Sequence, residues 1–172
     1  MEKKDFRKHE SQRVAVFVDV ANMYYSAKNL HDGAKVNFGQ VLARAVSERQ
    51  LVRAMAYVIR AEVGEEQAFY EALEKQGYEV RAKDLQVFPG GAKKGDWDVG
   101  ISVDAIRMAD KLDTIVLVTG DGDFVSLVDY LQNNKGCRVE VIAFRRTCSG
   151  KLVEEADDFF DLDSDLRKFL IK

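Results

Sequence analysis

Short, unbroken runs of apolar residues recur along the chain and predict the strands of a buried sheet. The run from Val14 to Val18 is typical, because it is rich in β-branched residues and has no polar position on either face. A strand covered on both faces needs this composition, since neither row of its side chains meets water. The same pattern predicts five strands, at residues 14–18, 51–59, 78–82, 115–118 and 139–144.

Between these runs, apolar residues recur at intervals of three and four, which is the spacing of one helical face. Helices are therefore predicted in the segment that ends near residue 30 and at residues 38–46, 65–76, 97–109, 124–131 and 164–171. The side chains expected to face the core are Phe69, Ala72 and Leu73 in the third helix and Val99, Val103 and Ile106 in the fourth. Residues 83–95, rich in glycine and lysine, are expected to form a loop.

Strands that alternate with helices predict an α/β fold of three layers, in which helices flank a central, mostly parallel sheet of about five strands. Residues 1–12 are predicted to form a flexible basic arm. Residues 13–172 are predicted to form a single domain that ends in an acidic C-terminal helix. Ligands of such sheets bind beyond the carboxyl ends of the strands, where the strand order switches.

The composition is that of a globular protein with a substantial core, with 47% hydrophobic and 32% charged residues in a chain of 172. Its two cysteines are too few for a disulfide framework and suit a reducing compartment. No apolar stretch approaches the roughly 20 residues that span a bilayer, and the charged N-terminus lacks the apolar segment of a secretory signal. We therefore expect a cytoplasmic protein without a membrane partner.

The formal net charge of −3 excludes a uniformly basic surface, but the charge is uneven along the chain. Basic residues cluster in the N-terminal arm, at Lys93–Lys94 and at Arg145–Arg146, and acids crowd the C-terminal end. A local basic cluster matters more for phosphate binding than the total charge. The alternative, that each cluster is an ordinary solvated face, stays open.

Acidic residues follow two of the predicted buried strands. Asp19 comes directly after the first run, and Asp121 and Asp123 follow the run that ends at Val118. Because parallel strands end at one edge of a sheet, these carboxylates are expected to converge there. Asp98, in the first turn of the helix after the glycine-lysine loop, joins them if that helix begins at the same edge.

Clustered carboxylates repel one another, and a cation removes that conflict. Carboxylate oxygens without histidine or cysteine suit Mg²⁺ or Mn²⁺ rather than Zn²⁺. The competing interpretation is structural, because an aspartate after a strand often caps the next helix, and Asp-Gly-Asp also suits a turn. The coincidence of two acidic strand ends favours the metal site.

Three segments resemble the signature segments of NYN domains, which belong to the PIN-like nuclease superfamily. They run from Val16 to Tyr24, from Lys94 to Asp104 and from Val118 to Phe124, in the order found in that family. The bacterial LabA-like branch is the most similar, and the resemblance covers residues 13–145 approximately. It implies a PIN-like fold and metal-dependent ribonuclease activity.

The resemblance implies roles for individual residues. Asp19, Asp98, Asp121 and Asp123 match the acidic metal-binding positions, and Asn22 matches the polar residue after the first strand. The middle segment is one residue longer than the usual Lys-Gly-x-Asp. Both Asp96 and Asp98 are therefore candidates there, with Asp98 favoured because Val-Gly follows it. Two residues are secondary candidates: Asp104, a further acid of that segment, and Thr119.

Three functions are compatible with these residues. The first is a ribonuclease that binds Mg²⁺ or Mn²⁺ and cleaves RNA, chiefly single-stranded. In this hypothesis the phosphate contacts come from Lys94, Arg145 and Arg146, and the base-stacking aromatics are Trp97 and Tyr24. The second is an RNA-binding or partner-binding module without turnover, and a homodimer is one oligomeric state compatible with the sequence. The third, a phosphohydrolase of small phosphoesters, ranks lower, because Asp19-Val-Ala replaces the Asp-x-Asp of such enzymes.

Overall fold

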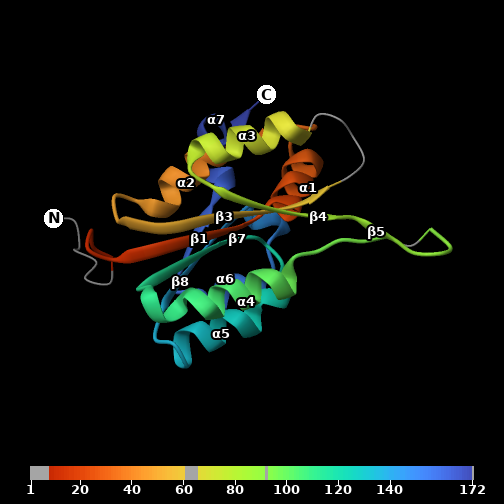
Figure 1. Ribbon diagram of the computed structural model, residues 1–172. Coiled ribbons are helices and arrows are strands. Elements are labelled where there is room, and N and C mark those ends of the chain that lie inside the picture. The colour runs from red at the N-terminus through yellow and green to blue at the C-terminus, as the bar shows by residue number, and fades with distance from the viewer. Residues whose placement is uncertain (1–7, 61–65, 92, 172) are drawn as a thin grey trace.

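A six-stranded parallel sheet forms the centre of the computed structural model, which describes residues 8–60, 66–91 and 93–171 (Figure 1). The strand order is β4-β3-β1-β7-β8-β9. The strands are β1 (Arg13–Asp19), β3 (Gln50–Arg60), β4 (Glu79–Asp84), β7 (Thr114–Val118), β8 (Arg138–Ala143) and β9 (Asp158–Asp161). The predicted α/β fold with a parallel sheet is confirmed, and β9 adds a strand to the five expected.

Helices cover both faces of the sheet and complete three layers (Figure 1). One layer contains α1 (Val20–Leu30), α2 (Phe38–Val46), α3 (Glu66–Gln76) and α7 (Leu166–Phe169). The other contains α4 (Asp98–Met108), α5 (Val125–Asn133) and α6 (Gly150–Glu155). Short 3₁₀ turns lie at η1 (Ala109–Lys111), η2 (Gly122–Phe124), η3 (Arg145–Thr147) and η4 (Leu162–Asp165).

The strand order switches direction between β1 and β7. From β1 the chain builds outward through β3 to β4, then returns to place β7 on the other side of β1 and continues outward to β9. Val18 lies beside Val118 in the register, so β1 and β7 end level with each other. Both strands are buried along almost their whole length, as their apolar sequences require. A ligand site is therefore expected beyond Val18 and Val118.

Two segments differ from the sequence-based expectation. Each contains a pair of two-residue β-strands where a loop or a helix was expected. Within residues 83–95, β5 (Gln86–Val87) pairs with β6 (Lys93–Lys94) to make a small hairpin that projects from the body (Figure 1). At the C-terminus, only Leu166–Phe169 is α-helical, and β10 (Leu170–Ile171) then pairs with β2 (Lys35–Val36). The acids predicted for a C-terminal helix lie largely in α6, β9 and η4.

The predicted inward faces of two helices were correct only in part. In α3, Leu73 is buried as predicted, but Phe69 is 38% exposed and Ala72 is exposed. In α4, Ile106 packs against the core as predicted, but Val99 and Val103 face solvent, and Ile101 and Ala105 are the buried residues. Apolar residues lie on more than one side of α4, so periodicity alone does not select the buried side.

The end of the predicted N-terminal arm is packed on the domain. Gln12 is buried, its side chain accepts a hydrogen bond from Arg49, and its carbonyl accepts one from the Gln50 amide. Arg49 in turn forms a bidentate ion pair with Glu140, at 2.8 and 2.9 Å. Residues 1–7 lie outside the described residues. Among the described residues, no helix has the length and apolarity to cross a membrane.

Candidate metal centre

Three carboxylates meet beyond the ends of β1 and β7. One oxygen each of Asp98, Asp121 and Asp123 lie within 4.8 Å of one another. This is the only group of its kind among the residues that the structure describes. It contains three of the four aspartates singled out in the sequence, and Asp98, at the start of α4, comes from the edge of the sheet where β1 and β7 end.

The fourth aspartate, Asp19, lies next to this group but outside its 4.8 Å circle. Its Oδ1 accepts the Asn22 amide at 3.2 Å and so caps α1, and its Oδ2 accepts the Thr119 hydroxyl at 3.3 Å. The helix-cap interpretation is therefore correct for Asp19 without excluding a role at the cluster. Thr119, predicted as secondary, joins the ends of β1 and β7.

The carboxylates raise one another's proton affinity. Burial raises the pKa of Asp98 to about 6, and the charges of Asp121, Asp96, Asp19 and Asp123 add to this effect. Burial also raises the pKa of Asp19, with Asp121 and Asp96 contributing against its two hydrogen bonds. A divalent cation would relieve this repulsion, so the donor set fits a hard, oxygen-preferring metal.

The structure separates Asp98 from the other acids of its segment. Asp96 is exposed, and its Oδ1 accepts the Asp98 amide at 3.2 Å, so it supports the start of α4. Asp104 lies two turns further along α4, buried against Tyr57, whose hydroxyl donates to Asp104 Oδ2 at 2.8 Å. Of these three acids, only Asp98 belongs to the cluster.

The loop that carries Asp121 and Asp123 is held from two sides. Asn22 accepts the Gly120 amide at 2.9 Å, which ties α1 to this loop, and Asp121 accepts the Asp123 amide and caps η2. A Cβ added at Gly122 would lie 2.8 Å from the Ser149 hydroxyl. The loop therefore needs its small residues because the segment around Ser149 packs directly on it. Ser149 was not among the predicted site residues, although the glycines on both sides of Asp121 indicate a close neighbour.

The predicted substrate-binding residues differ in how far contacts within the protein already hold their side chains. Trp97 donates its indole N–H to the Val58 carbonyl at 2.9 Å and packs against Tyr57, with the Lys83 ammonium 4.6 Å from its ring centre. These contacts explain Trp97 by packing and do not require a base. Tyr24, on α1, is 46% exposed and meets Tyr25 edge-on.

The paired arginines follow β8 at the same edge of the sheet. Arg146 forms an ion pair with Asp163 at 3.3 Å and remains 58% exposed. The backbone amide of Arg145 donates to Asp161, and its side chain is exposed. Lys94 falls in β6, but its side chain lies outside the described residues.

A model of the NYN domain matches residues 13–163. The chain belongs to the NYN domain family. It is 29% identical over 168 residues to the protein LabA ("low amplitude and bright") of Synechococcus elongatus, covering 93% of this chain and 88% of LabA. The crystal structure of VPA0982, a protein of unknown function from Vibrio parahaemolyticus, has a TM-score of 0.85 and 36% identity, covering 95% of this chain and 99% of that one. The resemblance to NYN domains, and to LabA among them, is confirmed.

Proposed function

We propose that this NYN domain protein is a metal-dependent ribonuclease that hydrolyses phosphodiester bonds at the cluster of Asp98, Asp121 and Asp123. The observation that carries the proposal is the convergence of these three carboxylates at the switch in strand order. The PIN-like family adds a nucleic acid as the class of substrate. Mg²⁺ or Mn²⁺ is the expected cofactor, because all the candidate ligands are carboxylate oxygens.

Each residue of the site has a distinct part in this proposal. Asp98, Asp121 and Asp123 would hold the metal, with Asp19 as a further ligand or as an acceptor beside it. When bound, a divalent metal supplies Lewis acidity that activates water and stabilises charge on phosphate oxygens. Asn22 positions the Gly120–Asp121 loop through its hydrogen bond to the Gly120 amide. Arg145 and Arg146, exposed at the same edge, would contact the RNA backbone.

RNA cleavage by the full-length protein in the presence of Mn²⁺ tests the proposal. We expect Asp121→Asn to lose at least about a hundredfold in rate, since even partners behind a metal ligand commonly contribute 10- to 100-fold. Asp129→Asn is the matched control, because Asp129 is an exposed acid of α5 whose carboxylate accepts a hydrogen bond from Asn133. It should cleave at the wild-type rate.

Two outcomes would overturn the proposal. Equal cleavage by the wild type and Asp121→Asn would assign the activity to another site or to a contaminant. Salt-dependent RNA binding without cleavage in any divalent metal would select the alternative function, an RNA-binding regulatory module.

A further inference from the structure

Two exposed arginines converge on one buried carboxylate on the flank of α4. Asp104 is 4% exposed, and its Oδ2 already accepts the Tyr57 hydroxyl. Arg81, from the edge strand β4, reaches Asp104 Oδ2 at 3.6 Å, and Arg107, one turn further along α4, reaches Oδ1 at 3.6 Å. Their side chains remain 42% and 70% exposed. Each guanidinium has five donors, so both keep N–H groups that point away from Asp104.

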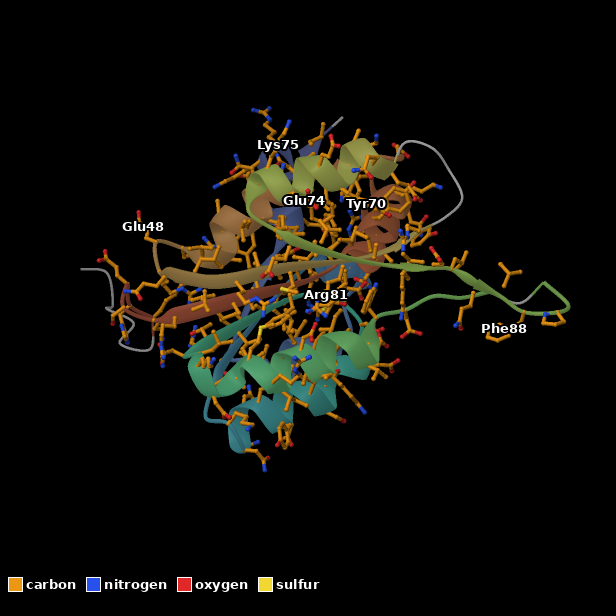
Figure 2. The ribbon with its side chains drawn as sticks, in the orientation of Figure 1. Glu48, Tyr70, Glu74, Lys75, Arg81 and Phe88 are labelled. Atoms are coloured by element: carbon orange, nitrogen blue, oxygen red, sulfur yellow. The ribbon has the colours of Figure 1, made fainter. Side chains whose placement is uncertain are left out.

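These arginines belong to a longer basic row. Lys83 follows Arg81 on the same face of β4 and lies over Trp97. Arg53, on the neighbouring strand β3, contacts Met108 of α4 and binds Glu79 at 2.7 and 2.8 Å. We call Arg53, Arg81, Lys83 and Arg107 the basic flank. Figure 2 shows Arg81 between the sheet and α4.

The basic flank concentrates positive charge on a protein that is acidic overall. The flank carries four positive charges, and the two acids paired with it, Glu79 and Asp104, carry two negative charges. Its net charge is therefore +2, although the net charge of the whole chain is −3. Asp104 also holds two guanidiniums in place before any ligand arrives. A pre-positioned pair of guanidiniums matches the geometry of phosphate oxygens.

The basic flank approaches the acidic cluster at the start of α4. Arg107 lies nine residues after Asp98, which is about two and a half turns, so the two side chains leave opposite sides of the helix. The approach comes from Lys83 instead, which lies over Trp97, the residue before Asp98. A chain of phosphates that follows the flank past Lys83 would therefore reach the beginning of α4.

We propose that the basic flank binds the sugar–phosphate backbone of RNA and leads the strand to the acidic cluster. This inference rests on the proposed function for its choice of RNA. It assigns binding to Arg81 and Arg107, which the sequence does not single out, and it gives Asp104 a positioning role that holds both arginines.

Fluorescence anisotropy with a labelled single-stranded oligouridylate, in EDTA and at several KCl concentrations, tests the inference on the full-length protein. We expect Arg81→Ala and Arg107→Ala each to weaken binding roughly fivefold and to reduce the slope of log affinity against log salt by about 0.7, the value for one lost phosphate contact on a single strand. Arg167→Ala is the matched control, because Arg167 is exposed on α7, on the opposite face of the sheet (Figure 1), and it should bind as the wild type does.

The outcomes separate this inference from the nuclease proposal. Wild-type affinity and slope in both arginine variants, or no binding of the oligouridylate at all, would overturn the basic flank as an RNA site. Polyglutamate that competes as well as RNA would indicate an acidic protein partner and would also overturn it. Arginine-dependent binding with no Mn²⁺-dependent cleavage would support the flank while the nuclease proposal fails. Because Arg107 is 70% exposed, its variant is expected to fold, and its melting temperature checks this.

Discussion

Among single residues, Asp98 shows most directly that the folded protein disfavours the ionised form of a residue in its own acidic cluster. Its carboxylate begins α4, where the helix dipole favours a negative charge, yet burial and four neighbouring acids raise its pKa to about 6. The folded protein therefore keeps a proton on Asp98 that the unfolded chain loses near pH 4. The stability that this proton provides is present below about pH 4 and is lost as pH rises through about 6.

Asp98→Asn should therefore stabilise the metal-free protein near neutral pH. Asp98 is partly exposed, so solvent screening reduces the effect to on the order of 1 kcal/mol, or about 2–4 °C in Tm for a chain of this size. The gain should vanish at about pH 4, where the wild-type carboxyl is protonated as well. Thermal unfolding in EDTA at both pH values measures it, with Asp165→Asn, an exposed acid beside α7, as control. A pH-independent gain would show that the ionisation of Asp98 is not the cause.

The same residue shows what sequence reasoning achieved at the site. Asp19, Asp121 and Asp123 follow from the rule that polar residues after buried parallel strands share one edge. The choice between Asp96 and Asp98 did not follow from that rule, because the segment is one residue longer than the family pattern. The structure brings Asp98 into the cluster, and Asp96 instead accepts the amide that begins the helix.

At the scale of elements, α4 is the helix on which both proposed sites depend. Its first residue, Asp98, reaches the acidic cluster, and Asp104 holds the two arginines of the basic flank. Trp97 is the N-cap residue of this helix, and its ring lies so close to Gly100 that a Cβ there would be 2.4 Å from Cε3. The ring can lie in this place, where it donates a hydrogen bond to the Val58 carbonyl, only because residue 100 has no side chain.

Gly100→Ala should therefore be destabilising although alanine is the better helix former. Overpacking commonly costs about 1–3 kcal/mol, which exceeds the gain of up to ~1 kcal/mol from helix propensity. The shift of α4 should also weaken metal binding through Asp98. Gly39→Ala is the control, because its Cβ would lie no closer than 3.4 Å to a neighbouring atom, and the nearest atoms belong to the flexible end of Gln76. Urea unfolding of both variants compares them, and equal or greater stability of Gly100→Ala would contradict this account.

At the scale of the whole molecule, the strand order decides where the acids meet. β1 lies at the centre, between β3 and β7, so the ends of β1 and β7 flank the switch in direction. Residues 100 positions apart, Asp19 and Thr119, become hydrogen-bonded neighbours there. The acidic cluster itself comes from two separate parts of the chain, at residue 98 and at residues 121–123, and it exists only in the folded state. A metal that binds the cluster must stabilise that state.

Mn²⁺ should raise the melting temperature of the wild type in a concentration-dependent manner. At a hundred times the Kd, binding to the native state adds about 2.7 kcal/mol, or roughly 5–10 °C for a chain of this size. Asp123→Asn should lose most of this increase, while Asp129→Asn should keep it. Differential scanning fluorimetry measures both, and an equal shift in all three proteins would place the bound metal elsewhere.

The amino-acid sequence alone predicted five of the six strands of the sheet and the acids at its carboxyl edge. It did so because buried parallel strands require unbroken apolar runs, and because the residue after such a strand must lie at that edge. The tertiary structure alone decided which side of α4 is buried, since apolar residues occur on more than one side of this helix. It also decided that Arg81 and Arg107 converge on Asp104. The Arg81 contact joins β4 to α4, and no local pattern of residues specifies a contact between two separate elements.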